Sequence, residues 1–499
     1  MSTSTFTTFD RRVFAVAVVV YLCAAWFSTG FHAADEHYQV IAFAEAKLGN
    51  QPLDEMPWEF DARIRSAFLP TLCIGVFKVS SAVGLNDPFA MSFLLRFITA
   101  LFALYAIRRF VGAVRHNLLP AQWKPFLLLS FFLWFLPFMG VRFAGETWSG
   151  LFILLALAAL ISPKPRTARY FQCGLFLGLA FLCRPPTLFM ALGIVLWLVL
   201  VKRERARSIL YLVLGIAVMM LAGIALDSWY YNEPTITAWN YLRQGITGTG
   251  DQRFISYAWW YYPAWLIKYT IPPFGLAILA AFATLLAFRP KHILVWVIVP
   301  ILLLHLALAH KDLRFLYPIA FLLPVLLVQA WSVWVERKVL KPTPSRTIMF
   351  ILGAVVVINL LALLVVITSP AGSGRTRLAA LVRSRYSGEA VRLNYVADST
   401  TVWDIRIPCF YLPPTASDTL IDAPCSPMSR ISGTIELLVT DQPGTACNGL
   451  DGRTWTVVGS AIPPGKQFAL KWYEWEDRKP VWKLYESRPK GMPHLPSAP

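Results

Sequence analysis

The chain has 499 residues, of which 57% are hydrophobic, 14% aromatic and only 15% charged. Such a composition excludes a soluble globular protein, a coiled coil and a disordered scaffold. The 46 Lys and Arg residues outnumber the 28 Asp and Glu residues and give a net charge of +18. The basic residues cluster in short segments between apolar runs, so they indicate membrane topology and not a nucleic-acid partner.

Apolar runs that are long enough to cross a bilayer recur along the first 368 residues. A hydrocarbon core of about 30 Å needs about 20 helical residues at 1.5 Å per residue. The apolar segment 66–83 is expected to be a re-entrant or interfacial element, because one more crossing there would separate the basic segments. We therefore expect a multi-pass α-helical membrane protein with about 11 transmembrane helices, near residues 13–31, 89–107, 124–141, 148–162, 169–184, 187–201, 209–226, 266–288, 293–309, 315–334 and 348–368.

The basic segments predict which face of the membrane each loop occupies. With these crossings they fall on one face, which the positive-inside rule makes cytoplasmic. The opposite face carries the first long loop 32–88, the second large loop 227–265 and the tail. We therefore expect this face to be extracytoplasmic. The first apolar run has no signal-peptide cleavage pattern and is expected to remain as a helix.

The tail, residues 369–499, differs in composition from the transmembrane domain 1–368. Strand-like stretches such as Val391–Val396 and Thr434–Val439 alternate with Pro, Gly, Asp and Ser. The sequence therefore predicts a small C-terminal α/β or β-rich extracytoplasmic domain.

The seven Cys residues divide between these two regions. Four of them lie in or near apolar helices, where we expect packing roles: Cys23, Cys73, Cys173 and Cys183. The other three, Cys409, Cys425 and Cys447, lie in the tail. An oxidising compartment would allow one disulfide there, and the sequence leaves the pairing open.

Two adjacent carboxylates, Asp35 and Glu36, follow the first apolar run. A carboxylate at the membrane surface can act as a general base toward a hydroxyl, because partial burial fixes its geometry and its neighbours tune its pKa. The alternative is that the two residues cap the amphipathic helix expected at residues 36–49 and favour its dipole. Although His32 and His37 flank them, the spacing matches no metal-binding template, and we expect neither a metal nor a cofactor.

Two further groups on the same face combine aromatic rings with hydrogen-bonding side chains. The first contains Trp58, Glu59 and Arg65, and the second contains Trp239 and Asn240, with Arg243 close behind. Such residues can stack on sugar rings and bond hydroxyls, but they also form the belt that anchors a protein at the lipid surface. The residues alone leave this choice open.

A cationic motif, His-Lys-Asp-Leu-Arg-Phe, occupies residues 310–315 on the face that elsewhere carries few cations. Arg can bond two oxygens of a phosphate and Lys acts as a point charge, so His310, Lys311 and Arg314 suit a phosphate or pyrophosphate headgroup. The alternative is that Asp312 pairs internally with Lys311 or Arg314.

Taken together, these groups resemble the mannosyltransferases of glycosyltransferase family 22, in the GT-C superfamily. That family includes enzymes that build the glycosylphosphatidylinositol anchor and the luminal mannoses of the lipid-linked N-glycan precursor. The resemblance covers about residues 10–335 and depends on the following ordered set: His32…Asp35-Glu36…Gln39, Trp58-Glu59-Phe60…Arg65-Ser66, Asp227-Ser228-Trp229-Tyr230-Tyr231…Thr237…Trp239-Asn240-Tyr241 and His310-Lys311-Asp312-Leu313-Arg314-Phe315-Leu316-Tyr317-Pro318.

The resemblance implies a GT-C membrane enzyme that moves a sugar, usually mannose, from a polyprenyl-phosphate donor of the dolichyl or undecaprenyl type to a glycan or glycolipid acceptor. It also implies a site on the luminal side of an endoplasmic reticulum membrane or on the periplasmic side of a bacterial inner membrane. Asp35 then becomes the expected base, with Glu36 beside it, because an inverting displacement needs one base and the phosphate leaves without an acid. The cations expected to stabilise the departing phosphate are His310, Lys311, Arg314 and Arg142. The residues expected to bind substrate are His32, Gln39, Trp58, Glu59, Arg65, Trp239, Asn240 and Arg243.

Three positions depart from the family pattern. Two alanines separate His32 from Asp35 where the family has His-Pro-Asp-Glu, Ala42 replaces a glutamate, and Gly145-Glu146 replaces Ser-Asn. Two other classes stay open, a transporter or flippase of a lipid-linked sugar and a non-catalytic subunit of a membrane glycosylation complex. A transporter would place ionisable residues at mid-membrane in two similar halves, a pattern that the sequence does not clearly show.

Overall fold

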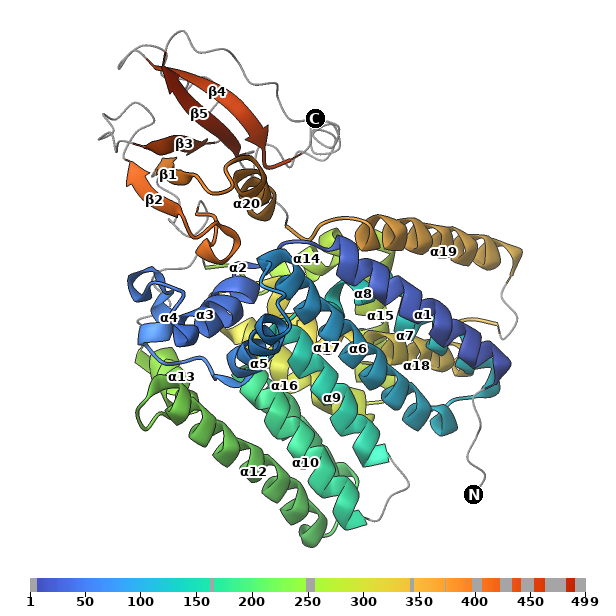
Figure 1. The fold of residues 1–499 in the computed structure, drawn as a ribbon. Helices are drawn as coiled ribbons and strands as arrows, with labels where there is room; N and C mark the ends of the chain where they lie inside the picture. Colours follow the sequence, from blue (N-terminus) through green and yellow to red (C-terminus); the bar gives the residue numbers. More distant parts are fainter. Residues whose placement is uncertain are drawn as a thin grey trace.

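The apolar runs fold into a helical bundle, and the polar tail folds against one end of it, as the computed structural model shows (Figure 1). We call this end of the bundle the sheet end. The structure describes residues 7–161, 166–247, 256–341, 345–372, 374–396, 406–421, 433–440, 453–462 and 482–489.

Helices form at the expected apolar runs. The bundle contains α1 (Thr8–Phe27), α6 (Pro88–Val114), α7 (Pro120–Phe132), α8 (Leu136–Met139), α9 (Gly145–Ile161), α10 (Arg166–Cys183), α11 (Leu188–Leu196), α12 (Ala206–Tyr231), α13 (Thr237–Thr247), α14 (Tyr261–Tyr269), α15 (Pro272–Phe288), α16 (Ile293–Ala307), α17 (Tyr317–Ala320), α18 (Leu323–Glu336) and α19 (Arg346–Ile367). The first long loop contains α2 (Ala34–Glu36), a π-helical turn η1 (His37–Ile41), α3 (Ala42–Leu48), α4 (Trp58–Asp61) and α5 (Phe68–Ala82).

Three of the expected helices are interrupted. The runs at 124–141, 266–288 and 315–334 each break just before a helix that has a proline in its first turn. Proline has no N–H and disfavours helical backbone in the residue before it, so it fits a helix start better than a helix interior. At the second break Ile271 has a φ of 66°. These breaks shorten the helices on which a count of crossings depends.

Length and composition identify three described helices that could each cross a membrane alone: Pro88–Asn117, Ala206–Tyr231 and Arg346–Ile367. Two bent pairs also qualify when each is taken together. α15 and α16 meet at 114°, and α17, with the turn before it, meets α18 at 70°. The expected number of crossings therefore stays a prediction, while the bundle has the apolar helices of a membrane protein.

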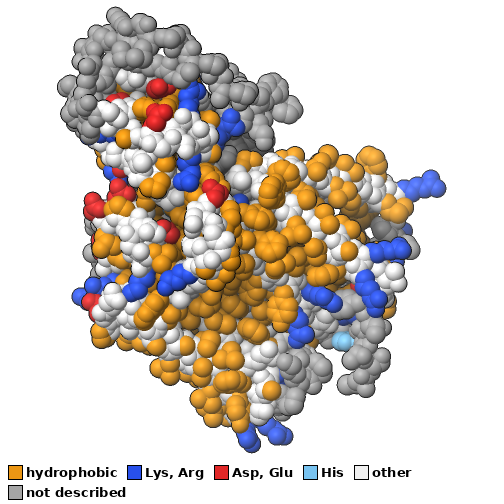
Figure 2. Space-filling view, viewed as in Figure 1, with side chains coloured by type: hydrophobic (Ala, Val, Ile, Leu, Met, Phe, Trp, Pro, Cys, Tyr) orange, Lys and Arg blue, Asp and Glu red, His pale blue; other side chains and the backbone are white. Residues whose placement is uncertain are grey.

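The centre and the edge of the bundle differ in exposure. α9 is buried from Glu146 to Leu160, so it forms the middle of the bundle. α10 packs between α9 and α12, and it approaches α12 closely where Gly174 faces Gly215, since a Cβ on either residue would strike the other helix. Most apolar side chains of α12 and α19 are exposed or only partly buried. Figure 2 shows that the bundle surface is largely apolar, as a surface facing lipid requires.

The end of the bundle away from the sheet gathers basic residues. Asp10 at the start of α1 pairs with Arg115, just beyond α6, at 3.1 Å and accepts a hydrogen bond from Trp123 of α7 at 2.8 Å. In the same way, the indole of Trp197 donates to the carbonyl of Lys291 at 2.8 Å and joins two more of the basic segments. The structure thus brings together chain segments that the positive-inside rule assigns to one face.

The segment expected to be re-entrant or interfacial forms α5 at the sheet end. The carboxylate of Asp227, near the end of α12, accepts hydrogen bonds from the Ser66 hydroxyl and from the Ala67 amide directly before α5. Further along, Phe77 stacks on Phe410 of the tail, with ring centroids 5.3 Å apart. Both contacts place α5 beside the tail and the end of α12.

The tail forms a five-stranded sheet in the order β2-β1-β3-β5-β4. Its strands are β1 (Ala390–Val396), β2 (Ala416–Ile421), β3 (Thr434–Thr440), β4 (Arg453–Ser460) and β5 (Lys483–Pro489). β1 pairs in parallel with β2 and β3, whereas β5 pairs antiparallel with β3 and β4. α20 (Gly374–Arg385) precedes the sheet and buries Leu378 and Val382 in the same core. The expected strands are confirmed, and the mixed sheet with its helix is of the α/β kind.

The tail contacts the first long loop directly. Arg406 pairs with Glu55 at 3.2 Å, and the Cys409 thiol donates a hydrogen bond to Gln51 at 2.7 Å. Cys409 is therefore a free thiol in the structure. The two other tail cysteines, Cys425 and Cys447, lie outside the described residues.

Candidate active site

A cleft opens at the sheet end between the first long loop, the start of α9 and the end of α10. Its charged lining residues are Asp35, Arg65, Glu146 and Arg184. With its open mouth included, the cleft holds about 490 Å³ of empty space. These residues are far apart in the chain, so the packing of the bundle itself assembles the site.

Asp35, which lines the cleft, pairs with Arg314, which lies outside the lining. The Arg314 guanidinium lies 3.0 Å from the Asp35 carboxylate, whose side chain is 26% exposed. Asp312 holds the arginine from another side, accepting from its Nε at 2.8 Å and from its backbone amide at 2.9 Å. The internal pairing considered for Asp312 therefore occurs, and Arg314 reaches Asp35 as well.

The surroundings of Asp35 favour its ionised form. Burial by itself would raise its pKa, but the guanidinium groups of Arg314, Arg65 and Arg184 overcome that effect and hold the pKa of Asp35 below its ordinary value. A carboxylate that is ionised at neutral pH and partly open to a cleft can accept a proton from a bound hydroxyl.

The two other cleft arginines are also held by carboxylates. Arg184 pairs with Glu146 at 2.6 Å, and Arg65 lies 3.4 Å from Glu59, which also accepts from Gln39 at 3.3 Å. A guanidinium carries five N–H donors, and each pair occupies only a part of them. The Nε atoms of Arg65 and Arg184 have no partner in the described part of the chain. Arg65 and Arg184 thus bring two positive charges to the cleft, each partly offset by its carboxylate partner.

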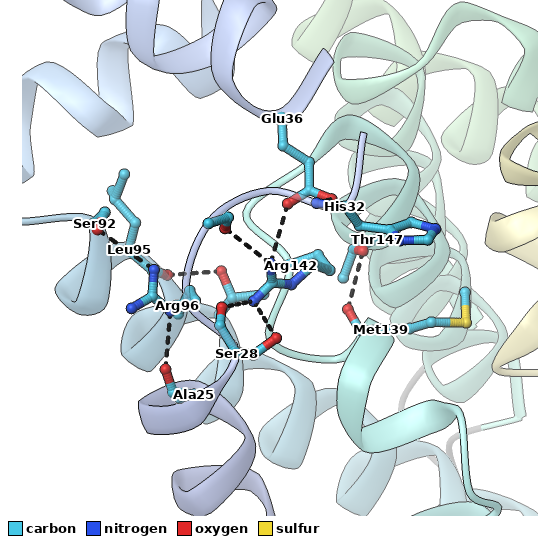
Figure 3. A network of polar contacts seen from close by, with 12 residues as sticks. Ala25, Ser28, His32, Glu36, Ser92, Leu95, Arg96, Met139, Arg142 and Thr147 are labelled. Atoms are coloured by element: carbon cyan, nitrogen blue, oxygen red, sulfur yellow. Dashed lines mark hydrogen bonds and ion pairs between the residues drawn. The ribbon is translucent and has the colours of Figure 1, made fainter. Parts of the chain in front are cut away.

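Glu36 points away from the cleft. Adjacent residues on a helical turn point about 100° apart, so Asp35 and Glu36 of α2 face different surroundings. Glu36 lies 3.5 Å from Arg142 and accepts from the His32 amide at 3.2 Å (Figure 3). Burial raises the pKa of Glu36, and Arg142 opposes that rise. Asp35 lines the cleft and Glu36 does not, so the structure does not place the two expected carboxylates side by side at one site.

Arg142 holds the backbone at the end of α1. It is buried and donates to the carbonyl and the hydroxyl of Ser28, both at 2.7 Å, and to the carbonyl of Gly30 at 3.2 Å (Figure 3). These bonds, with the Glu36 pair, fix the entry into the first long loop. Arg142 does not line the cleft, so the structure does not bring it to the place where the sequence predicts a bound phosphate.

Lys311 also differs from its expected role. Its side chain is buried, and its ammonium donates to the carbonyls of His305, Leu306 and Leu308 at the end of α16. Such a cation satisfies carbonyls that the helix leaves unpaired and complements the negative end of the dipole. Lys311 therefore caps α16.

His310 likewise lies outside the cleft lining. Its ring makes an edge-to-face contact with that of Phe315, with the ring centroids 5.6 Å apart.

The expected sugar-binding residues divide into two groups. Gln39 and Arg65 line the cleft, and Glu59 is buried directly behind them. The others lie outside its lining, namely His32, Trp58, Trp239, Asn240 and Arg243. The His32 ring is 3.1 Å from the Tyr317 hydroxyl, Asn240 donates to the carbonyl of Arg63, and Trp239 and Arg243 are exposed on α13.

Glu146 and Arg184 line the cleft but are not among the residues that the sequence predicts to act there. Each is an ionisable residue at a helix end on the face opposite the basic segments, and such residues are costly near a bilayer unless they have a partner or a function. That signal is present in the sequence, but their pairing is not, because 38 residues separate them. Among the described residues, no three His, Cys, Asp or Glu side chains gather closely enough to hold a metal ion.

The chain is a bundle of apolar helices with an added sheet, and a charged cleft lies at the end of the bundle beside that sheet. The crystal structure of ArnT from Cupriavidus metallidurans bound to undecaprenyl phosphate has this fold, with a TM-score of 0.57, 13% sequence identity, and coverage of 96% of this chain and 98% of that one.

The chain belongs to the Alg9-like mannosyltransferase family, whose model matches residues 12–372. It is 24% identical over 300 residues to GPI alpha-1,2-mannosyltransferase 3 of Xenopus laevis, covering 59% of this chain and 54% of that protein. It is 23% identical over 336 residues to GPI mannosyltransferase 3 of Drosophila melanogaster, covering 65% of this chain and 57% of that protein. The chain thus spans about half the length of the relatives it matches.

Proposed function

We propose that the protein transfers mannose from a polyprenyl-phosphate donor, of the dolichyl or undecaprenyl type, to a hydroxyl of a lipid-linked glycan. The observation that carries this proposal is the ion pair between Asp35, which lines the cleft, and Arg314. It sets a carboxylate that can take a proton beside a cation that can hold a phosphate. Family membership supports mannose as the sugar, and the undecaprenyl phosphate of the ArnT structure supports a polyprenyl-phosphate donor.

The two side chains divide the reaction between them. The acceptor hydroxyl attacks the anomeric carbon, the bond from that carbon to the phosphate oxygen breaks, and Asp35 takes the hydroxyl proton. The polyprenyl phosphate leaves with one more negative charge, which Arg314 stabilises with help from Arg65 and Arg184. No acid is needed at the leaving group, because a phosphate monoester is a stable anion at neutral pH.

Donor binding also activates the base in this scheme. Arg314 lowers the pKa of Asp35 in the empty cleft. A phosphate that competes for the Arg314 donors would weaken this pair, and the loss of a nearby cation raises the pKa of a carboxylate. The base then becomes stronger only when the donor is present.

The acceptor is a glycolipid in this proposal, because the relatives are named for the glycosylphosphatidylinositol pathway. Their names also favour an α-1,2 linkage. The cleft lies at the sheet end, opposite the basic segments, and the positive-inside rule then favours a luminal or periplasmic site.

Transfer of radioactive mannose from synthetic polyprenyl-phosphate-mannose by the purified protein tests the proposal. We expect Asp35→Asn to lose at least about a hundredfold in kcat, the size of a general-base contribution. Asp54→Asn, an exposed carboxylate of the same loop, is the matched control and should retain activity. Unchanged turnover in Asp35→Asn would remove Asp35 from the mechanism. Movement of the donor across liposomes without transfer would indicate a transporter instead.

A further inference from the structure

A second cavity lies beside the candidate active site. It is enclosed by the start of the first long loop, by α6 and by Tyr411 of the tail, and it holds about 330 Å³ of empty space with its opening included. Its charged lining residues are Glu36, Arg96 and Arg142. None of these belongs to the proposed transfer mechanism, so the cavity needs its own explanation.

The charges around this cavity do not balance. Arg142 has Glu36 as its partner at 3.5 Å. Arg96, buried in α6, donates to neutral groups, the Ala25 carbonyl at 2.9 Å and the Ser92 hydroxyl at 3.4 Å. Two guanidinium groups therefore face one carboxylate in the described lining, which leaves one positive charge without a counter-charge (Figure 3).

A buried charge without a counter-ion is costly, and proteins pair such charges or bind an ion beside them. The cavity also has unused polar atoms. Both ring nitrogens of His37, which is 1% exposed, and the Nε of Arg142 are buried and have no hydrogen-bond partner in the described structure. An unpaired charge and unpaired donors thus face the same small space.

We propose that this cavity binds one chloride ion between Arg96 and Arg142, with His37 supplying a further N–H. A single uncompensated positive charge calls for a monovalent anion. A water molecule would satisfy hydrogen bonds but would leave the positive charge without a counter-ion. A phosphate dianion would bring more negative charge than is needed and place it beside Glu36. Binding of this ion is independent of the transferase reaction.

The bound ion would join three separate parts of the chain. Glu36 and His37 belong to the loop that carries Asp35, Arg96 belongs to α6, and Tyr411 belongs to the tail. His37 already contacts the tail, with its ring centroid 5.6 Å from that of Tyr411. Chloride therefore stabilises the docking of the tail on the loop.

Thermal unfolding of the purified protein in detergent, with sodium chloride replaced stepwise by sodium gluconate at constant ionic strength, tests the site. We expect chloride to raise Tm saturably, by about 2 °C at a tenfold excess over Kd. Crystals soaked in sodium bromide should show an anomalous peak within hydrogen-bond distance of Arg96 and Arg142. An equal Tm in both salts together with no bromide peak would overturn the proposal.

Two variants of α6 make the test specific. Arg96→Met removes the uncompensated charge, so the dependence of Tm on chloride should disappear. Arg109→Met, which replaces an exposed arginine of the same helix, should keep it. A chloride effect that persists in Arg96→Met would place the ion elsewhere and contradict the assignment. If Arg96→Met does not fold, the chloride titration and the bromide peak of the unmodified protein still decide.

Discussion

Two ion pairs of equal length should differ strongly in what they contribute to stability. Arg184 and Glu146 lie 2.6 Å apart with side chains only 9% and 6% exposed. Arg289 and Glu336 also lie 2.6 Å apart, but their side chains are 33% and 57% exposed. Breaking a buried pair leaves a charge without water or partner and costs about 3–5 kcal/mol. An exposed pair contributes at most about 1 kcal/mol, because water screens it.

We therefore expect Arg184→Met to lower the free energy of unfolding by about 3 kcal/mol, the lower end of that range. The lower end applies because Glu146 lies in the first turn of α9, where the helix dipole still favours a negative charge. Arg289→Met, the matched control, should cost less than about 1 kcal/mol. Replacing both partners, Arg184→Met with Glu146→Leu, should restore much of the stability, since no unpaired charge remains.

Unfolding by SDS titration in mixed micelles measures these differences, and the double variant completes a thermodynamic cycle for the pair. Transfer activity should stay low in the double variant even though its stability recovers, because Arg184 lines the cleft. Equal costs for Arg184→Met and Arg289→Met would refute the assigned difference between buried and exposed pairs. A double variant no more stable than Arg184→Met alone would refute it as well.

Three further predictions follow from individual contacts. In Arg314→Met the pKa of Asp35 should rise, because burial raises it and the opposing charge of Arg314 is lost. The acid limb of the pH profile of kcat/KM should then move to higher pH, and an unmoved limb would contradict the pairing. Asp227→Ala should lower the free energy of unfolding in the SDS titration by about 3 kcal/mol, since it leaves the buried Ala67 amide unpaired, and an unchanged value would show that the bond does not hold α5. Lys311→Met should lower the free energy of unfolding by about 1–3 kcal/mol without changing KM for the donor. A raised KM would show that Lys311 contributes to donor binding.

The long apolar elements are predictable from the sequence, but their interruptions are not. A run of apolar residues of sufficient length predicts a helix, because lipid leaves no other way to satisfy the backbone. Proline marks three of the interruptions, yet Pro125 and Pro300 lie inside α7 and α16. Whether a proline ends a helix therefore depends on tertiary neighbours that supply the missing bonds.

The site is predictable in its residue types more than in their roles. Asp35 and Arg65 line the cleft and Arg314 pairs with Asp35, and all three are charged residues on the predicted extracytoplasmic side. The motif that contains Arg314 also contains Lys311, and only the fold shows that Arg314 reaches Asp35 while Lys311 caps α16. A charged residue in an apolar region indicates that a partner exists. Which residue is the partner depends on contacts between distant segments, and these are visible only in the fold.

A structure of the protein with a polyprenyl-phosphate-mannose analogue bound would test the proposed transfer most directly. We expect the phosphate within hydrogen-bond distance of Arg314, with the anomeric carbon of the sugar facing Asp35. A phosphate held at the opposite end of the bundle, or a sugar that lies out of reach of Asp35, would contradict the central claim that this cleft is the site of transfer.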